Sequence, residues 1–281
     1  MLNLNSKKTY FNKPFPICVF NDFFDKQFFL ELENKFPHQS LFLENNVNRM
    51  HGDTTYGDSL YTTLLDESPA YKKLHEWVYS ENFVNFFLDL FKNELESQND
   101  LIEDISEFKI KSSPTEVGNI FNLESFQIDN NKYLYPRLDI GFGKKGYGIK
   151  TGGRGPHIDN PQRLISVLIY LGGYNSMIGG EHRVYSLLNK KLNLEKVFPT
   201  EKNLLIASLQ NNLAFHDVNP IIEIDGQRNA FYLAISASKR IWSKSPRTKI
   251  NIKYNKLRVE PSLCEKSISY VKNTIKTFIK D

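Results

Sequence analysis

The sequence predicts a mainly β protein in which helices flank an antiparallel sandwich or barrel. From about residue 133, short apolar runs alternate with Gly, Pro, Asn and Asp, as in closely spaced strands. Before that point, apolar residues recur at helical spacing. The 281 residues are 40% hydrophobic and 13% aromatic, which is enough for one large core. We expect a single domain over 1–281, with a helical support region (1–132), a core (133–240), and a basic segment with a C-terminal helix (241–281).

The N-terminal region reads as one short strand followed by helices. "PFPICVFNDFF" (14–24) predicts a strand and a turn. The next segment, 25–37, predicts a helix with Asp25 as N-cap and Pro37 as its stop. The Phe-rich stretch 68–97 predicts the longest helix, whose aromatic stripe faces the core. Residues 99–119 are polar and predict irregular structure.

The core region contains six apolar runs that read as strands: "YLYPRLDIGF", "LISVLIYLGG", "EHRVYSLL", "NLLIASL", "NPIIEI" and "NAFYLAIS". Asp225-Gly226, between the last two runs, predicts a turn that reverses the chain. From about Pro261 the chain reads as helical again.

Charge and cysteine content exclude several classes of protein. The net charge of +4 is too small to indicate nucleic-acid binding. Residues 239–258 carry eight Lys or Arg and no acid, which favours a solvated face over an anion-binding patch. Two cysteines form neither a disulfide framework nor a zinc cluster, so we expect a reducing compartment. With no secretory h-region and no membrane-length apolar run, we expect a cytoplasmic protein without membrane contact.

His157 and Asp159 stand two positions apart, just before a long apolar run. On an extended segment such residues point to the same face, so both side chains can aim at one point. One further histidine would complete a set of two histidines and one carboxylate, which suits non-haem Fe(II) and leaves coordination positions open.

Among the six histidines, His216 stands in a strand-like context with Arg228 twelve positions later. Across the expected hairpin, Arg228 would return to the neighbourhood of His216. A guanidinium group beside a metal ligand suits a dicarboxylate cosubstrate, because it binds the far carboxylate with two hydrogen bonds. His182 reads as an ordinary sheet residue, and Arg163 as a side chain that solvates a strand end.

The ordered set His157-x-Asp159, His216 and Arg228, embedded in short strands, resembles the Fe(II)/2-oxoglutarate-dependent dioxygenases, specifically their prolyl-hydroxylase-like branch. "HIDNP" followed by "LISVLIYLG", then "GGEHRVY" and "FHDVNPI" with a later Gly-x-Arg, are similar to successive strands of that branch. The match covers roughly residues 133–240, with a looser match at the N-terminus.

This resemblance implies a double-stranded β-helix (jelly-roll) fold with iron bound by His157, Asp159 and His216. It also implies that Arg228, together with Tyr147, binds the 2-oxoglutarate cosubstrate. The implied reaction uses O₂ to decarboxylate 2-oxoglutarate to succinate and to hydroxylate an unactivated C–H, with ascorbate as a further candidate cofactor.

The substrate stays open between an amino acid, a peptidyl residue and another small metabolite. Basic residues in the Gly-rich stretch 141–155 suggest an anionic group on it, and that stretch could form a lid; these residues are Lys144, Lys145, Lys150 and Arg154. The oligomeric state is equally open.

Two other functions compete with hydroxylation. A jelly-roll that keeps its ligands as a relic could be a non-catalytic binding module for a sugar or a peptide. A halogenase needs a vacant coordination position where the carboxylate sits; because Asp159 fills it, hydroxylation is favoured.

Overall fold

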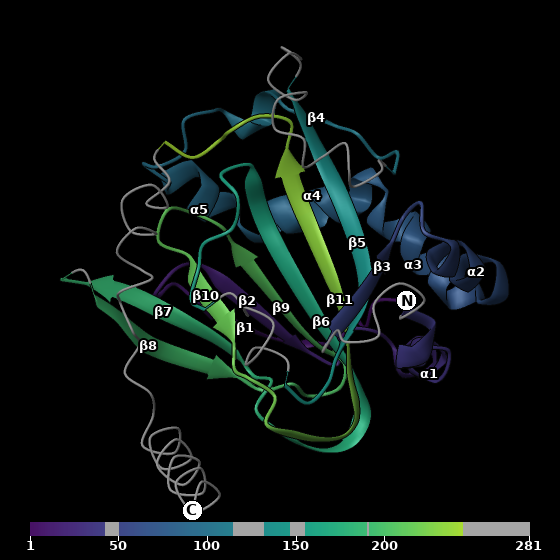
Figure 1. Ribbon diagram of the computed structural model, residues 1–281. Coiled ribbons are helices and arrows are strands. Elements are labelled where there is room, and N and C mark those ends of the chain that lie inside the picture. The colour runs from purple at the N-terminus through teal and green to yellow at the C-terminus, as the bar shows by residue number, and fades with distance from the viewer. Residues whose placement is uncertain (43–50, 115–131, 147–154, 190, 244–281) are drawn as a thin grey trace, which may run out of the picture.

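The computed structural model describes residues 1–42, 51–114, 132–146, 155–189 and 191–243, and Figure 1 shows its layers. A large curved sheet carries helices on one face, and a small sheet covers part of the other face. The expected mainly β fold with flanking helices is confirmed, and the two facing sheets fit a jelly-roll core.

Seven strands of the large sheet follow the order β1-β2-β9-β6-β11-β5-β3, and β4 pairs in parallel with β5. Their bounds are β1 (Lys7–Phe11), β2 (Ile17–Asn21), β3 (His51–Thr55), β4 (Lys109–Ile110), β5 (Tyr133–Gly143), β6 (Arg163–Ile178), β9 (Leu204–Leu209) and β11 (Glu223–Ala237). The small sheet has the order β10-β7-β8, with β7 (His182–Leu188), β8 (Lys191–Phe198) and β10 (Phe215–Val218).

Side chains alternate between the two faces of the large sheet, as the period of two in a strand requires. On β11, Phe231, Leu233 and Ile235 belong to the cluster that packs against the helices. Ala230 and Tyr232 belong instead to the cluster between the two sheets. The sheet therefore separates a helix-covered apolar core from an inner face that the small sheet covers.

The helices are α1 (Lys26–Asn34), α2 (Ser59–Glu67), α3 (Pro69–Val78), α4 (Glu81–Leu90) and α5 (Lys92–Ser97), with 3₁₀ turns η1 (Gln39–Phe42) and η2 (Ile105–Glu107). The prediction for α1 is confirmed, since the Asp25 side chain accepts a hydrogen bond from the Phe28 N–H at 3.0 Å. None of the described helices combines the length and apolar character needed to cross a bilayer.

The prediction of a single helix over 68–97 is wrong, because this segment forms three helices, α3, α4 and α5. At the first break, the Ser80 hydroxyl donates to the Trp77 carbonyl at 2.6 Å and accepts from the Phe83 N–H at 3.3 Å. A serine that bonds to nearby backbone groups in this way ends one helix and caps the next.

The strand expected within 14–24 is β2, but β1, β3 and β4 also lie before residue 133, contrary to the expectation of a helical support region. β2 pairs with β9 through positions such as Ile17 and Ser208, and β3 pairs with β5. The support region therefore contributes strands as well as helices to the large sheet. Whether residues 1–281 form one folding unit stays a prediction, and the C-terminal helix expected from Pro261 lies outside the described residues.

The hairpin turn expected at Asp225-Gly226 is also wrong. Both residues lie inside β11, at a shift in its register with β6. Gly226 has a φ of +112°, and a Cβ there would come within 2.4 Å of the Gly173 carbonyl oxygen. The glycine thus serves a bulge with close backbone approach, which needs the same residue type as a turn. β10 and β11 lie in different sheets, so Arg228 and His216 do not face each other across one hairpin.

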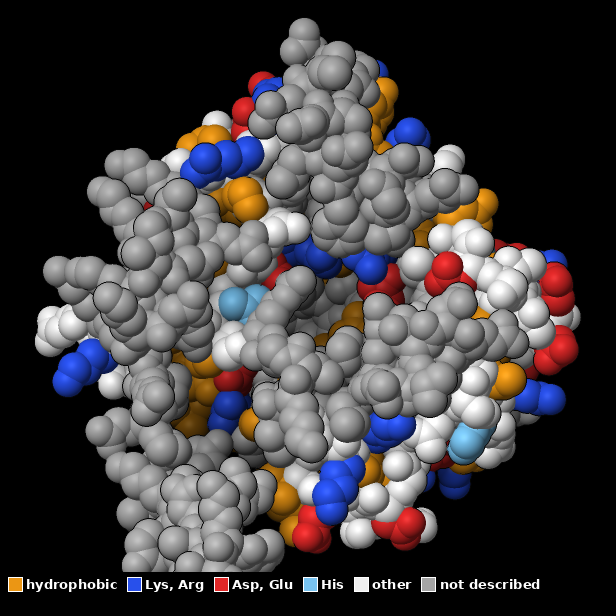
Figure 2. Space-filling view, in the orientation of Figure 1, with side chains coloured by type: hydrophobic (Ala, Val, Ile, Leu, Met, Phe, Trp, Pro, Cys, Tyr) orange, Lys and Arg blue, Asp and Glu red, His pale blue; other side chains and the backbone are white. Residues whose placement is uncertain are grey.

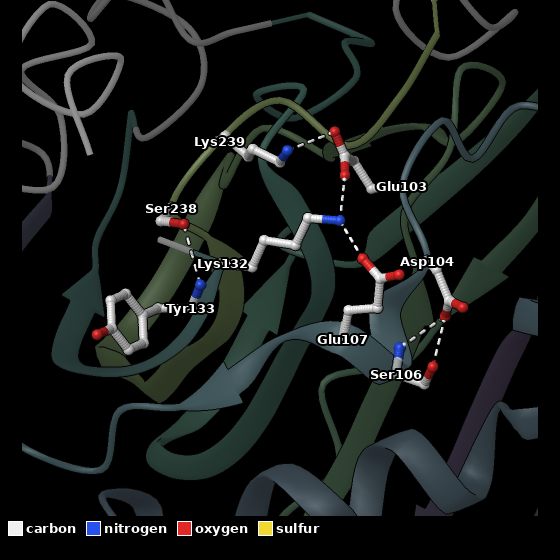
Figure 3. Close-up of polar contacts among 8 residues, drawn as sticks. All are labelled: Glu103, Asp104, Ser106, Glu107, Lys132, Tyr133, Ser238 and Lys239. Atoms are coloured by element: carbon white, nitrogen blue, oxygen red, sulfur yellow. Dashed lines mark hydrogen bonds and ion pairs between the residues drawn. The ribbon is translucent and has the colours of Figure 1, made fainter. Parts of the chain in front are cut away.

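A polar cluster connects the ends of strands β5 and β11 to the segment before β4 (Figure 3). Glu103 forms ion pairs with Lys239 at 2.6 Å and with Lys132 at 3.1 Å. Lys239 follows β11, and Lys132 precedes β5. Lys132 also pairs with Glu107. These contacts join the ends of two neighbouring strands to the same turn.

Candidate metal centre

His157 and His216 are held opposite each other by a backbone bridge between the segment before β6 and strand β10. His157 lies before β6 and His216 lies in β10, and each N–H donates to the other's carbonyl oxygen at 2.9 Å. The two residues are 59 positions apart in the sequence, yet their ring centroids are 4.6 Å apart. Asp159 follows two residues after the bridge.

The three predicted ligands converge. One ligand atom from each of His157, Asp159 and His216 lies within 4.8 Å of the others. Asp159 Oδ1 is 4.0 Å from His157 Nε2 and 3.9 Å from His216 Nε2. The side chains therefore surround a single point from three directions, as a metal ion requires.

Backbone carbonyl groups orient both imidazole rings. His157 Nδ1 lies 3.0 Å from the Gly155 carbonyl oxygen, and His216 Nδ1 lies 3.0 Å from that of Ala214. Because a carbonyl can only accept, we infer that each Nδ1 carries the proton. In the neutral ring, Nε2 then presents its lone pair toward Asp159, which is the tautomer a metal ligand needs.

The Asp159 carboxylate is ionised and oriented. Ser166, on β6, donates its hydroxyl to Asp159 Oδ2 at 2.6 Å, while Oδ1 faces both histidines. Burial raises the pKa of this carboxyl, but electrostatic interactions with His216 and Arg163 and the Ser166 hydrogen bond outweigh it, so the pKa falls well below its usual range. Two neutral nitrogen donors and one carboxylate oxygen fit a first-row divalent cation such as Fe(II).

Arg228 is fully buried on the inner face of β11. Its Nη1 donates to the Gly180 carbonyl oxygen at 2.6 Å, and its Nη2 donates to the Tyr232 hydroxyl at 3.1 Å. The guanidinium carbon lies 5.7 Å from the centre of the Tyr170 ring. Backbone and aromatic contacts thus fix the plane of the guanidinium group.

His182 is a buried residue close to the candidate ligand His216. This residue of β7 is buried, and its ring centroid lies 5.5 Å from that of His216. Burial, together with electrostatic interactions with His216, His157 and Arg228, lowers the pKa of His182 to about 3. The arginine and the ligands thus act electrostatically on the same buried ring. His182 lies on a strand, as expected, and its atoms are outside the converging set.

Arg163 differs from its expected place on a solvated strand end. Its Nε is out of contact with solvent and has no hydrogen-bond partner among the described residues, and its charge acts on Asp159. Nearby on β5, Arg137 forms a two-point ion pair with Asp139, with N–O distances of 2.8 and 2.7 Å. Arg163 therefore places a cation beside Asp159 that the sequence did not indicate, whereas the charge of Arg137 is balanced by Asp139.

Sequence reasoning missed Ser166, Tyr170 and Tyr232. Each is a polar or amphipathic residue at an inward position of an otherwise apolar strand, so strict alternation along β6 and β11 could have found them. Tyr147, Lys150 and Arg154 lie outside the described residues, whereas Lys144 and Lys145 follow β5. Figure 2 shows a histidine side chain on this face with basic and acidic side chains close to it.

No protein-family model matches the chain, and no curated protein matches it. Solved structures that resemble it include a prolyl 4-hydroxylase from Phytophthora capsici, at 15% identity and a TM-score of 0.46 over 78% of this chain. The chain spans 58% of the length of that protein.

Two bacterial structures are similar as well. A Pseudomonas putida prolyl-4-hydroxylase has 12% identity and a TM-score of 0.42, over 78% of this chain and 91% of its own. A 2OG-Fe(II) oxygenase family oxidoreductase from Burkholderia pseudomallei has 14% identity and a TM-score of 0.39, over 78% of this chain and 83% of its own. Similarity at this level does not assign an activity, so the function must be inferred from the side-chain geometry.

Proposed function

We propose that this protein is an Fe(II)- and 2-oxoglutarate-dependent dioxygenase that hydroxylates an unactivated C–H bond of an amino acid, a peptidyl residue or another small metabolite. The convergence of His157, Asp159 and His216 within 4.8 Å carries the proposal. Three protein ligands on one side of a metal ion leave the remaining positions open for a cosubstrate and O₂.

The bound Fe(II) would supply O₂ activation, which couples decarboxylation of 2-oxoglutarate to succinate with hydroxylation of the substrate. His157 and His216 would bind the ion through Nε2, and Asp159 through Oδ1. The backbone bonds at each Nδ1 keep both rings in the binding tautomer. Ascorbate is a candidate auxiliary reductant.

Arg228 would bind the far carboxylate of 2-oxoglutarate. A buried guanidinium group offers two parallel N–H donors to a carboxylate, and such charge-assisted pairs are the strong ones. The contacts of Arg228 with Gly180 and Tyr232 already orient it, so less freedom is lost when the cosubstrate binds. Tyr147 stays a second candidate for the same cosubstrate.

The substrate would carry an anionic group. Arg163 acts on Asp159 and its Nε has no hydrogen-bond partner in the part of the chain that the structure describes, and Lys144 and Lys145 follow β5. Positive groups near a site raise the local concentration of anionic ligands. The chemistry of the residues does not choose between a free amino acid and a peptidyl residue.

Anaerobic titration of the protein with Fe(II) and then 2-oxoglutarate tests the proposal. We expect a visible charge-transfer band in the wild type and none in His216→Ala. Succinate release, screened over free amino acids and proline-containing peptides, should then identify the substrate. Metal binding without succinate release under any of these conditions would favour a non-catalytic binding module.

A further inference from the structure

We propose that Ser166 is a positioning residue that restricts Asp159 to binding the metal through one oxygen. This inference rests on the proposed metal centre and names a part of it that the sequence did not indicate. The supporting contact is the 2.6 Å hydrogen bond from the Ser166 hydroxyl to Asp159 Oδ2.

The hydroxyl is held by a rigid part of the fold. Ser166 lies on β6, where it pairs with Ser208 of β9 on one side and with Ala234 of β11 on the other. Its neighbours Ile165 and Val167 point to the opposite face and are buried in the core against the helices. A residue paired on both sides cannot shift without disturbing three strands, so its hydroxyl is a fixed reference for Asp159.

The geometry divides the two carboxylate oxygens between two tasks. Oδ2 accepts the Ser166 hydroxyl, whereas Oδ1 lies 4.0 and 3.9 Å from the two histidine Nε2 atoms. Without the hydroxyl, rotation about the Cβ–Cγ bond would let both oxygens face the metal. The second oxygen would then occupy a position that the cosubstrate needs. Ser166 would thus keep a coordination position open.

The test compares Ser166→Ala and Ser166→Thr with Ser208→Ala as a matched control. Ser208 has a hydroxyl on the adjoining strand, which donates to the Ser166 carbonyl oxygen at 3.3 Å and does not contact Asp159. The apoproteins are titrated with Mn(II) for affinity and with Co(II) for the visible absorption bands at saturation. Thermal unfolding of each apoprotein checks the fold.

We expect Ser166→Ala to bind Mn(II) about 10- to 100-fold more weakly, as other losses of a ligand's supporting hydrogen bond do. Its Co(II) bands should shift, because the number of oxygens bound to the metal changes. Ser166→Thr keeps the hydroxyl and should retain wild-type bands, as should Ser208→Ala. A merely structural role would not shift the bands in Ser166→Ala alone.

Wild-type affinity and bands in a folded Ser166→Ala would overturn the inference, and so would equal shifts in Ser166→Ala and Ser208→Ala. If Ser166→Ala does not fold, Ser166→Cys replaces it, since a thiol is a weaker donor. Unshifted bands in Ser166→Cys would again overturn it. Failure of the proposed function has a different signature: the wild type and His216→Ala would bind the metals equally.

Discussion

Replacing Arg228 with alanine should weaken the use of 2-oxoglutarate and leave metal binding almost unchanged. Arg228 is fully buried, so its bonds to a bound carboxylate would form away from competing water. A charged hydrogen bond contributes about 1.5–3 kcal/mol. Because about 1.4 kcal/mol corresponds to a factor of ten, losing one such bond predicts a rise in the KM for 2-oxoglutarate of at least roughly tenfold, toward a hundredfold.

Two further variants separate charge from geometry. Arg228→Lys keeps the positive charge but has no second parallel donor, so its KM should be intermediate. Tyr232→Phe removes only the hydroxyl that accepts from Arg228 at 3.1 Å, and it should have a smaller effect than Arg228→Ala. The assay is initial-rate succinate formation against 2-oxoglutarate concentration, with Mn(II) affinity measured in parallel. An unchanged KM in a folded, metal-binding Arg228→Ala would refute this assignment, and Arg163 would be the next residue to test.

Other parts of the structure make further predictions. His216→Ala should abolish succinate formation while its thermal unfolding stays cooperative; wild-type turnover would exclude it as a ligand. Gly179→Ala should cost more than about 2 kcal/mol in urea unfolding, because φ is +90° and the new Cβ would lie 1.9 Å from a carbonyl oxygen; a loss within experimental error would contradict this geometry. Glu103→Gln should lower stability at neutral pH and by less at pH 3: hydrogen bonds from Lys239 and Lys132 lower the pKa of Glu103, so its contribution is fully present above its unfolded pKa and is lost as pH falls through its folded pKa. A pH-independent urea midpoint difference would argue against that pairing. A chain that begins at residue 130 lacks β1, β2 and β3 and should be insoluble or unfold without cooperativity, and a cooperative transition would contradict the single-unit prediction.

The candidate ligands could be predicted because their chemistry is local in sequence. His157 and Asp159 need only a spacing of two, and His216 stands in a short strand-like stretch of its own. The strand to which Arg228 belongs was also evident from its apolar run. Its inward direction follows from alternation along β11, which does not depend on how the preceding chain connects.

Connections were harder to predict because one residue type serves several backbone geometries. Asp225-Gly226 looks like a hairpin turn, yet a bulge also favours glycine, and only the pairing of β11 with β6 distinguishes the two. Ser80 ends a helix within a stretch whose apolar period continues past it. β8 was missed because charged and polar residues interrupt its apolar residues Leu192, Leu194, Val197 and Phe198, of which only Phe198 is buried.

Because a backbone bridge joins His157 and His216, the distance between these two candidate ligands does not depend on the length of the chain between them. Each residue is fixed by the other's N–H and carbonyl groups at 2.9 Å, across 59 positions of sequence. Insertions or deletions between the two ligands, or ahead of His157, can therefore change the surroundings of the site while the distance between the two nitrogen donors is conserved. A fold built in this way can acquire new substrates by changing its loops, without rebuilding its metal centre each time.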